Sequence, residues 1–434
     1  MSALINTAPI TAQASAPQSG LPEWFVSLQS KAWETFQATP MPTRRDENWR
    51  FAKLKQLDFD AFVPATPLAN PESLISRSNE LESSATKFIF ANEQLISAGG
   101  DLPEGVICLP LVEALKQHGD LVRDHFMKQE TKLGSAKFAA LHAAHLSSGV
   151  FIHVPKGIEL EAPIEVYHWI GGENTAVFPH TLVITGEHAK VKVVDYFQSA
   201  DDKAALCIAV NDLVAGTGSR LDYVAIQALN ENSKMIQVNA TVVGRDANAK
   251  GFIVNTGCTW ARSESLSRLE GEGGNSDMLS VSIPGTTQEY DQRTFQHHAV
   301  PHTTSDLLYK NSLYDQARTV FSGLIFVDEK AHFTDAYQTC RNLMMSQTVE
   351  ANSMPGLEIN ADQVKCSHGS TSAQIADEEI YYLRARGIDP VSARQLIARG
   401  FSVEAVEKLQ DQALEELILG YVDRKFDQLA THGA

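Results

Sequence analysis

The sequence predicts a mainly β protein whose strands form a solenoid between two helical regions. Three observations support this class. Apolar residues recur at helical spacing from residue 22 to residue 149. Alternating β-branched segments then begin at residue 150 and continue for roughly two hundred residues. Helical spacing returns after residue 370. The expected units are therefore residues 22–149, 150–370 and 371–434.

Residues 1–21 are rich in Ala, Ser and Pro and have no continuous apolar core, so we expect a disordered tail rather than a secretory signal. The following unit, 22–149, is predicted to be mostly helical. Two of its segments have apolar residues three or four positions apart, LVEALKQHGDLVRDHFMKQE and SAKFAALHAAHLSSG. The second begins with a Ser and ends before a Gly, which are typical helix boundaries.

The β region contains a loose repeat in which a turn and a small residue precede an alternating strand. The small residues are Ala189, Ser219, Ala249, Ser276 and Ser305, at intervals of 30, 30, 27 and 29 residues. A steady interval in a region of strands alone predicts stacked coils that share one core. The alternative is a β-sandwich of hairpins, whose strands would recur every 8–12 residues or so.

The C-terminal unit is predicted to contain three helices. Asp377 caps the first, which ends at Gly387, and the second runs from Pro390 to Gly400. The third, residues 402–429, is long and amphipathic. Its aliphatic stripe includes Val406, Leu409, Leu414, Leu417 and Ile418. This stripe either packs on the core, which is the default, or fits the groove of a partner.

Composition excludes several classes of protein. Hydrophobic residues make up 43% and charged residues 21%, as in soluble globular proteins. The net charge of −17 argues against binding to nucleic acid or to an anionic membrane. The chain also has no apolar run of the roughly 18 residues that a membrane span needs. Five cysteines without a CxxC pair indicate a reducing cytoplasm, and neither a zinc ribbon nor a ferredoxin-type cluster site within this chain alone.

Common catalytic motifs are missing from the sequence. It contains no GxxxxGK[ST] loop, so we expect this chain to bind no ATP by that route. It also lacks GxSxG, HExxH and a GxGxxG after a strand. His297 and His298 are adjacent, with His302 nearby, but neighbours on a strand point to opposite faces. Solvated or core histidines are therefore expected there, not a metal site.

Cys366 and His368 form the strongest candidate site. They are two positions apart, so a strand would place both side chains on one face, as ligands suited to Fe or Zn. Two ligands bind a metal weakly, so we expect the others to come from another chain. Two alternatives stay open: a nucleophile–base pair, or a buried cysteine beside a polar turn histidine.

Several segments of the chain together resemble one known family. They are MPTRRDENWRFAKLKQL, GVFIHVPKGIELEAPIEVYHW, HTLVITGEHAKVKVVDYF, ARTVFSGLIFVDEKAHFTDAYQTCRNLMMS and NLMMSQTVEANSMPGLEINADQVKCSHGSTSAQIADEEIYYLRARGI. The chain is similar in these segments to the SufB/SufD family of iron–sulfur cluster assembly proteins. The first segment and the CSHG tetrapeptide resemble the SufD branch rather than the SufB branch.

The resemblance implies a right-handed parallel β-helix core flanked by N-terminal and C-terminal helical domains. It also implies a non-catalytic scaffold that pairs with a SufB-type chain through the β-helix and docks a SufC-type ABC ATPase through the C-terminal helices. His368, and less strongly Cys366, would contribute to an interfacial iron or cluster site linked to iron entry. A purely structural partner of SufB, a thiol enzyme, and a homodimer formed without SufB are the alternatives.

Overall fold

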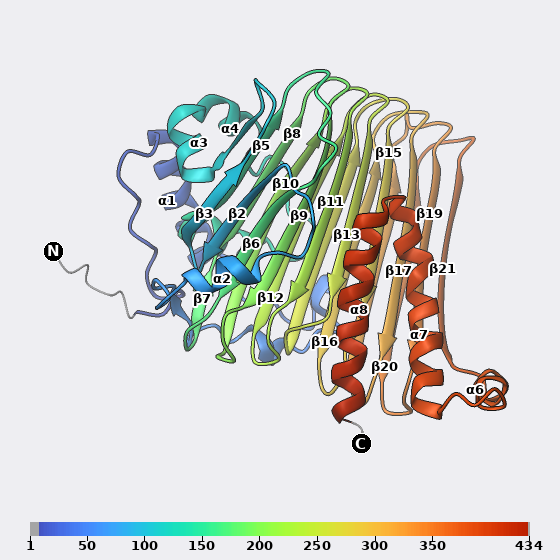
Figure 1. Ribbon diagram of the computed structural model, residues 1–434. Coiled ribbons are helices and arrows are strands. Elements are labelled where there is room, and N and C mark those ends of the chain that lie inside the picture. Colours follow the sequence, from blue (N-terminus) through green and yellow to red (C-terminus); the bar gives the residue numbers. More distant parts are fainter. Residues whose placement is uncertain (1–7, 433–434) are drawn as a thin grey trace.

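The computed structural model describes residues 8–432 and is mainly β. Two long sheets face each other, and the chain alternates between them, so that successive coils stack as a parallel β-helix (Figure 1). Helices lie at both ends of the sequence. The predicted fold class is confirmed.

The first sheet contains β1 (Val63–Pro64), β4 (Ile107–Pro110), β5 (Ser148–Val154), β7 (Thr175–Val177), β8 (Pro179–Thr185), β10 (Ala205–Ala215), β12 (Lys234–Val243), β14 (Trp260–Leu269), β16 (Glu289–His298), β18 (Arg318–Val327) and β20 (Glu350–Ile359). The second sheet contains β2 (Thr86–Ala91), β3 (Gln94–Gly100), β6 (Ile164–Ile170), β9 (Lys190–Ser199), β11 (Arg220–Ala228), β13 (Asn248–Asn255), β15 (Asn275–Ser282), β17 (Thr304–Leu313), β19 (Asp335–Met344) and β21 (Lys365–Gln374).

The repeat seen in the sequence marks one corner of the coils. Ala249, Ser276 and Ser305 stack directly on one another in the parallel register of β13, β15 and β17. Ala189 and Ser219 lie immediately before β9 and β11. All five side chains are buried. The ladder of Ala249, Ser276 and Ser305 continues from Leu221 in β11, so a small residue is found at this position in the later coils and not in every coil.

Along each strand, successive side chains point alternately to the inside and to the outside of the β-helix. The first coils have an aliphatic interior that includes Val150, Ile152, Val191 and Val193. Later coils have buried polar side chains on the inner face. Gln292 donates to Ser282 and Gln296 donates to Ser305, for example. The interior changes along the axis, from apolar packing to hydrogen bonding.

The N-terminal part combines helices with strands that the sequence reasoning did not predict. Its helices are α1 (Glu23–Ala38), α2 (Glu72–Arg77), α3 (Leu111–Gln117), α4 (Gly119–His125) and α5 (Ala136–His145), with short 3-10 turns η1 (Glu47–Trp49) and η2 (Leu54–Leu57). Strands β2 and β3, and β4 with β5, form antiparallel pairs that extend the first coils. The segment expected as one helix is broken at His118, which leaves the helical region with φ −132° and ψ 34°.

Residues 1–7 of the expected disordered tail lie outside the described residues. The described part is attached to the fold. Ile10 is fully buried, and its amide nitrogen donates to the carbonyl of Phe62 at 2.9 Å. The carbonyl of Ile10 accepts from Nε2 of His145 at 2.8 Å. These contacts tie the segment before α1 to the turn that precedes β1 and to α5.

The C-terminal helices are α6 (Asp377–Arg384), α7 (Pro390–Val406) and α8 (Gln412–His432), with the short turn η3 (Glu407–Leu409) between the last two. Asp389 caps α7, as its side chain accepts from the amides of Val391 and Ser392. The helix does not end at Gly400 as predicted. It continues to a break at Gln410, which has a left-handed conformation (φ 56°).

Tertiary contacts account for the displaced helix end. Lys250, on the outer face of β13, donates to the carbonyl oxygens of Lys408 and Leu409 at 2.6 and 3.1 Å. These are orphan carbonyls at a helix terminus, and the buried lysine satisfies them. The aliphatic stripe of residues 406–418 is buried against the second sheet, so it belongs to the core. Figure 1 shows α7 and α8 lying across that sheet. None of the helices within residues 8–432 is long and apolar enough to cross a membrane.

Candidate functional site

Cys366 and His368 lie on β21, the last strand of the β-helix. Cys366 is paired in register with Ala336, and His368 with Gln338, both of which are buried between the sheets. Cys366 packs at the edge of the small cluster that contains Ile325 and Ala336. Because side chains two positions apart share a face, His368 lies on the same inner face. The strand alternation expected from the sequence is therefore observed.

The two residues differ in exposure because β21 ends the stack. Cys366 is half-buried, whereas His368 is exposed, and most of β21 is exposed with it. Strand β19 covers one edge of β21, and within the described residues no further strand covers the other edge. A thiol and an imidazole are thus presented at the open end of the β-helix.

Two neighbours of this site were not identified from the sequence. Asp335 is the register partner of Lys365, and Tyr337 is the partner of Ser367. Tyr337 is 43% exposed, and a hydrogen bond to the Asp335 carboxylate raises the pKa of its phenol. Both lie about thirty residues away in sequence, one coil earlier. The repeat interval was the one signal that could have indicated their proximity.

Among the described residues, the candidate site does not hold a complete set of metal ligands. Across residues 8–432, no three His, Cys, Asp or Glu side chains are grouped so that they could hold a metal ion. Cys366 and His368 supply one soft and one borderline donor, a set that suits iron or zinc. Stable sites take three or four ligands. Cys366 and His368 alone supply fewer ligands than such sites take.

The surroundings of Cys366 disfavour its thiolate form. Burial, and secondarily the nearby Asp335 carboxylate, raise the pKa of the Cys366 thiol above its ordinary value. We therefore expect iodoacetamide to alkylate Cys366 in the isolated chain with a half-maximal rate at a pH above about 8.5, the ordinary cysteine pKa. Mass spectrometry of the peptide that contains Cys366 measures this rate. Rapid alkylation at pH 7 would contradict the expectation and favour a nucleophilic cysteine.

The histidines at 297 and 298 point to opposite faces, as the sequence predicted. His297 faces outward, and its Nε2 lies 2.9 Å from Oδ2 of Asp328. His298 faces inward, where its ring nitrogens contact Thr303 and Ser305 at 2.7 and 2.9 Å. Burial lowers the pKa of His298 to about 3. His302 stacks on Phe333. Each of these three rings has a partner in the fold, and they do not point toward a common position where a metal ion could bind.

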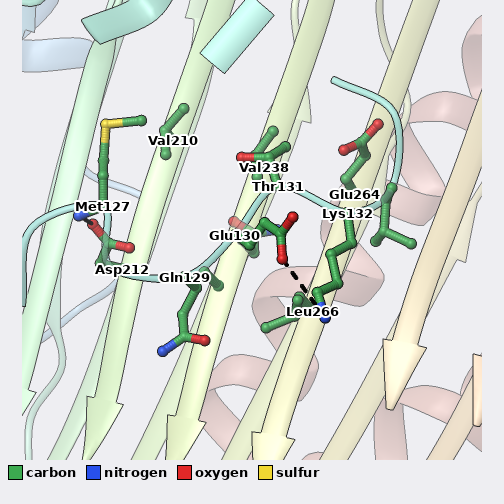
Figure 2. A pocket seen from close by; sticks show the side chains of 13 residues that line it. Met127, Gln129, Glu130, Thr131, Lys132, Val210, Asp212, Val238, Glu264 and Leu266 are labelled. Carbon is green, nitrogen blue, oxygen red and sulfur yellow. Dashed lines mark hydrogen bonds and ion pairs between the residues drawn. The ribbon is translucent and has the colours of Figure 1, made fainter. Parts of the chain in front are cut away.

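A small pocket lies on the outer face of the first sheet. Residues 127–133 cross the sheet and leave a space of about 20 Å³, walled by Gln129, Glu130 and Lys132 (Figure 2). Its floor is apolar, and it consists of Val210, Val238, Ala240 and Leu266. This volume is near the minimum for one water molecule, so the pocket does not hold a substrate.

The carboxylates beside this pocket are already engaged. Asp212 accepts from the amide of Met127 at 2.7 Å, and its Oδ2 lies 3.2 Å from Nε2 of His180. Glu264 accepts from the hydroxyl of Ser135 at 2.6 Å and from Nε of Arg262 at 2.7 Å. Ser135 was expected to cap α5, but it makes no side-chain cap and binds Glu264 instead. These acidic groups hold the N-terminal segment on the sheet.

Comparison with known proteins places most of the chain within one family. Residues 168–401 match the SufBD core domain of the SUF system for FeS cluster assembly, and residues 12–166 match the SufBD protein N-terminal region. The iron–sulfur cluster assembly protein SufD of Escherichia coli is 29% identical over 392 residues, covering 89% of this chain and 90% of that protein.

Relatives from Bacillus subtilis include both members of the family. Its SufD is 26% identical over 415 residues, covering 93% of this chain and 94% of that protein. Its SufB is 27% identical over 403 residues, covering 88% of this chain and 84% of that protein. The resemblance predicted from the sequence is confirmed: the chain belongs to the SufBD family of SUF-system iron–sulfur cluster assembly proteins.

Proposed function

We propose that this chain is a non-catalytic, SufD-type scaffold subunit that helps assemble iron–sulfur clusters in the cytoplasm as part of a SufB–SufC–SufD complex. The observation that carries this proposal is the position of Cys366 and His368. They form an incomplete donor set at the open end of a β-helix whose family is linked to cluster assembly. Three further features support it.

The open end suits pairing with a SufB-type chain. Strands β20 and β21 are the last strands of their sheets, and each pairs on one side within the described chain. An unpaired edge presents free N–H and C=O groups to another strand. Exposed apolar side chains lie close by, with Phe333 51%, Tyr337 43% and Ile359 39% exposed. A second β-helix placed here would cover them.

A shared interface explains the missing ligands. Iron or a nascent cluster is the cargo in this proposal. His368 is the first candidate ligand for it, and Cys366 is the second. The remaining thiolate or carboxylate ligands would come from the SufB-type partner. Iron would enter at this junction, because its ligands converge only when the two chains meet.

The C-terminal helices suit a SufC-type ATPase. Helix α6 has no buried residue, and Figure 1 shows it standing away from the sheets beside one end of α7. Tyr381, Tyr382, Val391 and Leu396 are each more than half exposed. Where exposed apolar side chains gather into one patch, they mark a contact surface. Since this chain has no phosphate-binding loop, ATP would be bound by the partner.

The alternative of a thiol enzyme is weaker. A nucleophilic cysteine needs a lowered pKa and an enclosed pocket, whereas the pKa of Cys366 is raised and His368 is exposed on an open face.

Native mass measurement of a mild, anaerobic purification tests the assembly. We expect a complex of this chain with one SufB-type chain and two SufC-type ATPases. The double variant Tyr381→Ser/Tyr382→Ser should lose one ATPase and keep the SufB-type chain. The matched double variant Phe333→Ser/Tyr337→Ser should weaken pairing with the SufB-type chain and keep the ATPase. Recovery of this chain as a monomer or homodimer alone, under low salt, would contradict the proposal.

A further inference from the structure

The segment from residue 43 to residue 55 forms an exposed band of positive charge on an otherwise acidic protein. It contains five basic residues, Arg44, Arg45, Arg50, Lys53 and Lys55, against two acidic ones, Asp46 and Glu47, in a chain of net charge −17. We propose that this band, the cationic strip, is a docking surface for a short acidic segment of a partner protein. The proposal is independent of the site at Cys366 and His368.

Most cations of the strip are unpaired. All five basic residues are exposed. Arg44, Arg45, Arg50 and Lys55 make no ion pair with any described residue, and Lys53 lies 3.6 Å from Glu289. Asp46 is used within the strip, where its carboxylate accepts from the amide of Thr43 at 2.7 Å. The strip therefore presents positive charge that the chain itself does not neutralise.

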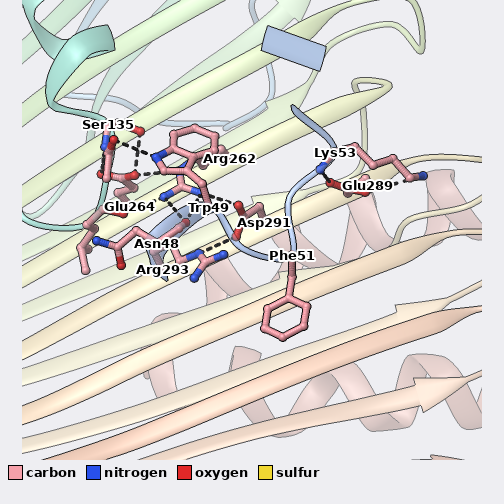
Figure 3. Close-up of polar contacts among 12 residues, drawn as sticks. Asn48, Trp49, Phe51, Lys53, Ser135, Arg262, Glu264, Glu289, Asp291 and Arg293 are labelled. Atoms are coloured by element: carbon pink, nitrogen blue, oxygen red, sulfur yellow. Dashed lines mark hydrogen bonds and ion pairs between the residues drawn. The ribbon is translucent and has the colours of Figure 1, made fainter. Parts of the chain in front are cut away.

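The backbone beneath these cations is held firmly to the first sheet. The ring of Trp49 stacks under the guanidinium of Arg262 at 3.7 Å, and its Nε1 donates to the carbonyl of Gly134 at 3.0 Å (Figure 3). Arg262 also donates to the carbonyl of Asn48. Its guanidinium thus holds both the ring and the backbone of the segment at this point.

A second anchor holds the other half of the strip. The amide of Lys53 donates to Oε1 of Glu289 at 2.9 Å. Arg318 donates to the carbonyl of Phe51 at 2.5 Å and to Glu289 at 3.0 Å. Buried charged groups thus fix the backbone on both sides of Arg50. A surface whose backbone is already ordered loses less entropy when a partner binds.

Charge complementarity and size favour a short acidic segment over a larger polyanion. Fields from exposed charges extend about 10 Å at 0.1 M salt. A membrane or a nucleic-acid duplex would extend beyond the strip and meet the acidic remainder of the surface. A short segment rich in Asp or Glu would contact the strip alone. Phe51, half-buried at its centre, offers one apolar contact to the same segment.

Fluorescence anisotropy with a labelled Glu-rich peptide tests the proposal on the full chain. We expect saturable binding that weakens with salt, and about tenfold weaker binding for Arg44→Ser/Arg45→Ser/Arg50→Ser, since each exposed cation contributes a small factor. The matched control, Lys156→Ser/Lys203→Ser/Arg245→Ser, removes three exposed cations elsewhere and should bind as the unmodified chain does. Circular dichroism checks that both variants are folded.

Two results would overturn the proposal. One is equal binding of the Glu-rich peptide by the unmodified chain and the strip variant. The other is tighter binding of a single-stranded oligonucleotide that has the same charge as the Glu-rich peptide, if the strip variant loses that binding. This result would make the strip a nucleic-acid site instead. Loss of peptide binding in the strip variant alone supports the proposal, whatever the outcome of tests on cluster assembly.

Discussion

Replacing Arg262 with Ala is expected to lower the free energy of unfolding by about 3–5 kcal/mol, the cost of leaving buried carboxylates without their cation. Arg262 lies on β14, and its side chain is fully buried. Its guanidinium contacts Glu264 on the same strand at 2.7 Å and Asp291 on β16, and both carboxylates are buried. Arg293 completes the cluster by donating to Asp291 at 2.7 Å (Figure 3).

The effect should be large because this cluster joins three distant parts of the chain. Besides Asn48 and the Trp49 ring, Arg262 donates to the carbonyl of Leu133 at 2.6 Å. Removing the guanidinium therefore leaves unsatisfied carbonyls as well as unpaired carboxylates. Residues 48–49 and 133–135 should loosen from the β-helix together.

Urea unfolding followed by tryptophan fluorescence measures this loss, since Trp49 stacks on Arg262. The control is Arg268→Ala on the same strand, where a half-exposed arginine pairs with Glu270 at 2.7 Å. An exposed pair contributes about 1 kcal/mol or less. Equal effects of the two substitutions would show that the buried cluster does not stabilise the fold as described.

Replacing His368 with Ala is expected to leave the complex intact and to reduce cluster formation by about tenfold or more. The imidazole is exposed on β21 and makes no contact that the fold requires, so its removal should not disturb assembly. Loss of even an indirect metal partner typically costs 10–100-fold in affinity, and a direct ligand should cost at least as much.

Anaerobic reconstitution with purified SufB-type and SufC-type partners, followed by absorbance and by iron and sulfide content, measures cluster yield. The matched control is Ser370→Ala, which alters the next side chain on the same face of β21 and should have no effect. An unchanged yield with His368→Ala, in an intact complex, would assign this chain a purely structural role beside SufB.

Patterns that depend on one strand or one coil could be predicted from the sequence. The alternation that places Cys366 and His368 on one face depends only on their own strand, and the structure shows it as predicted. Small buried residues such as Ser276 and Ser305 recur near the start of successive strands of the second sheet, and their spacing predicted the solenoid. The spacing of the aliphatic stripe that includes Leu417 and Ile418 is also a local pattern, and it predicted a helix face buried in the core.

Features that depend on distant partners could not be predicted. Helix α7 passes through Gly400 to Val406 and continues directly into η3, because Lys250, on another element, donates to the carbonyls of Lys408 and Leu409. Asp335 lies near Cys366 because β19 pairs with β21, a proximity that the pattern of a single strand does not reveal. The cluster around Arg262 joins segments that are more than two hundred residues apart, so no local sequence motif predicts these contacts.

The measurement that tests the central claim most directly is cluster yield with and without this chain. A SufB-type chain and a SufC-type ATPase would be reconstituted anaerobically with iron, sulfide source and reductant, alone or with an equal amount of this protein. If the chain is a scaffold that supplies part of an interfacial site, its addition should raise the iron and sulfide bound per complex, and the His368→Ala form should not. An equal yield in all three samples would contradict a role for this chain in cluster assembly.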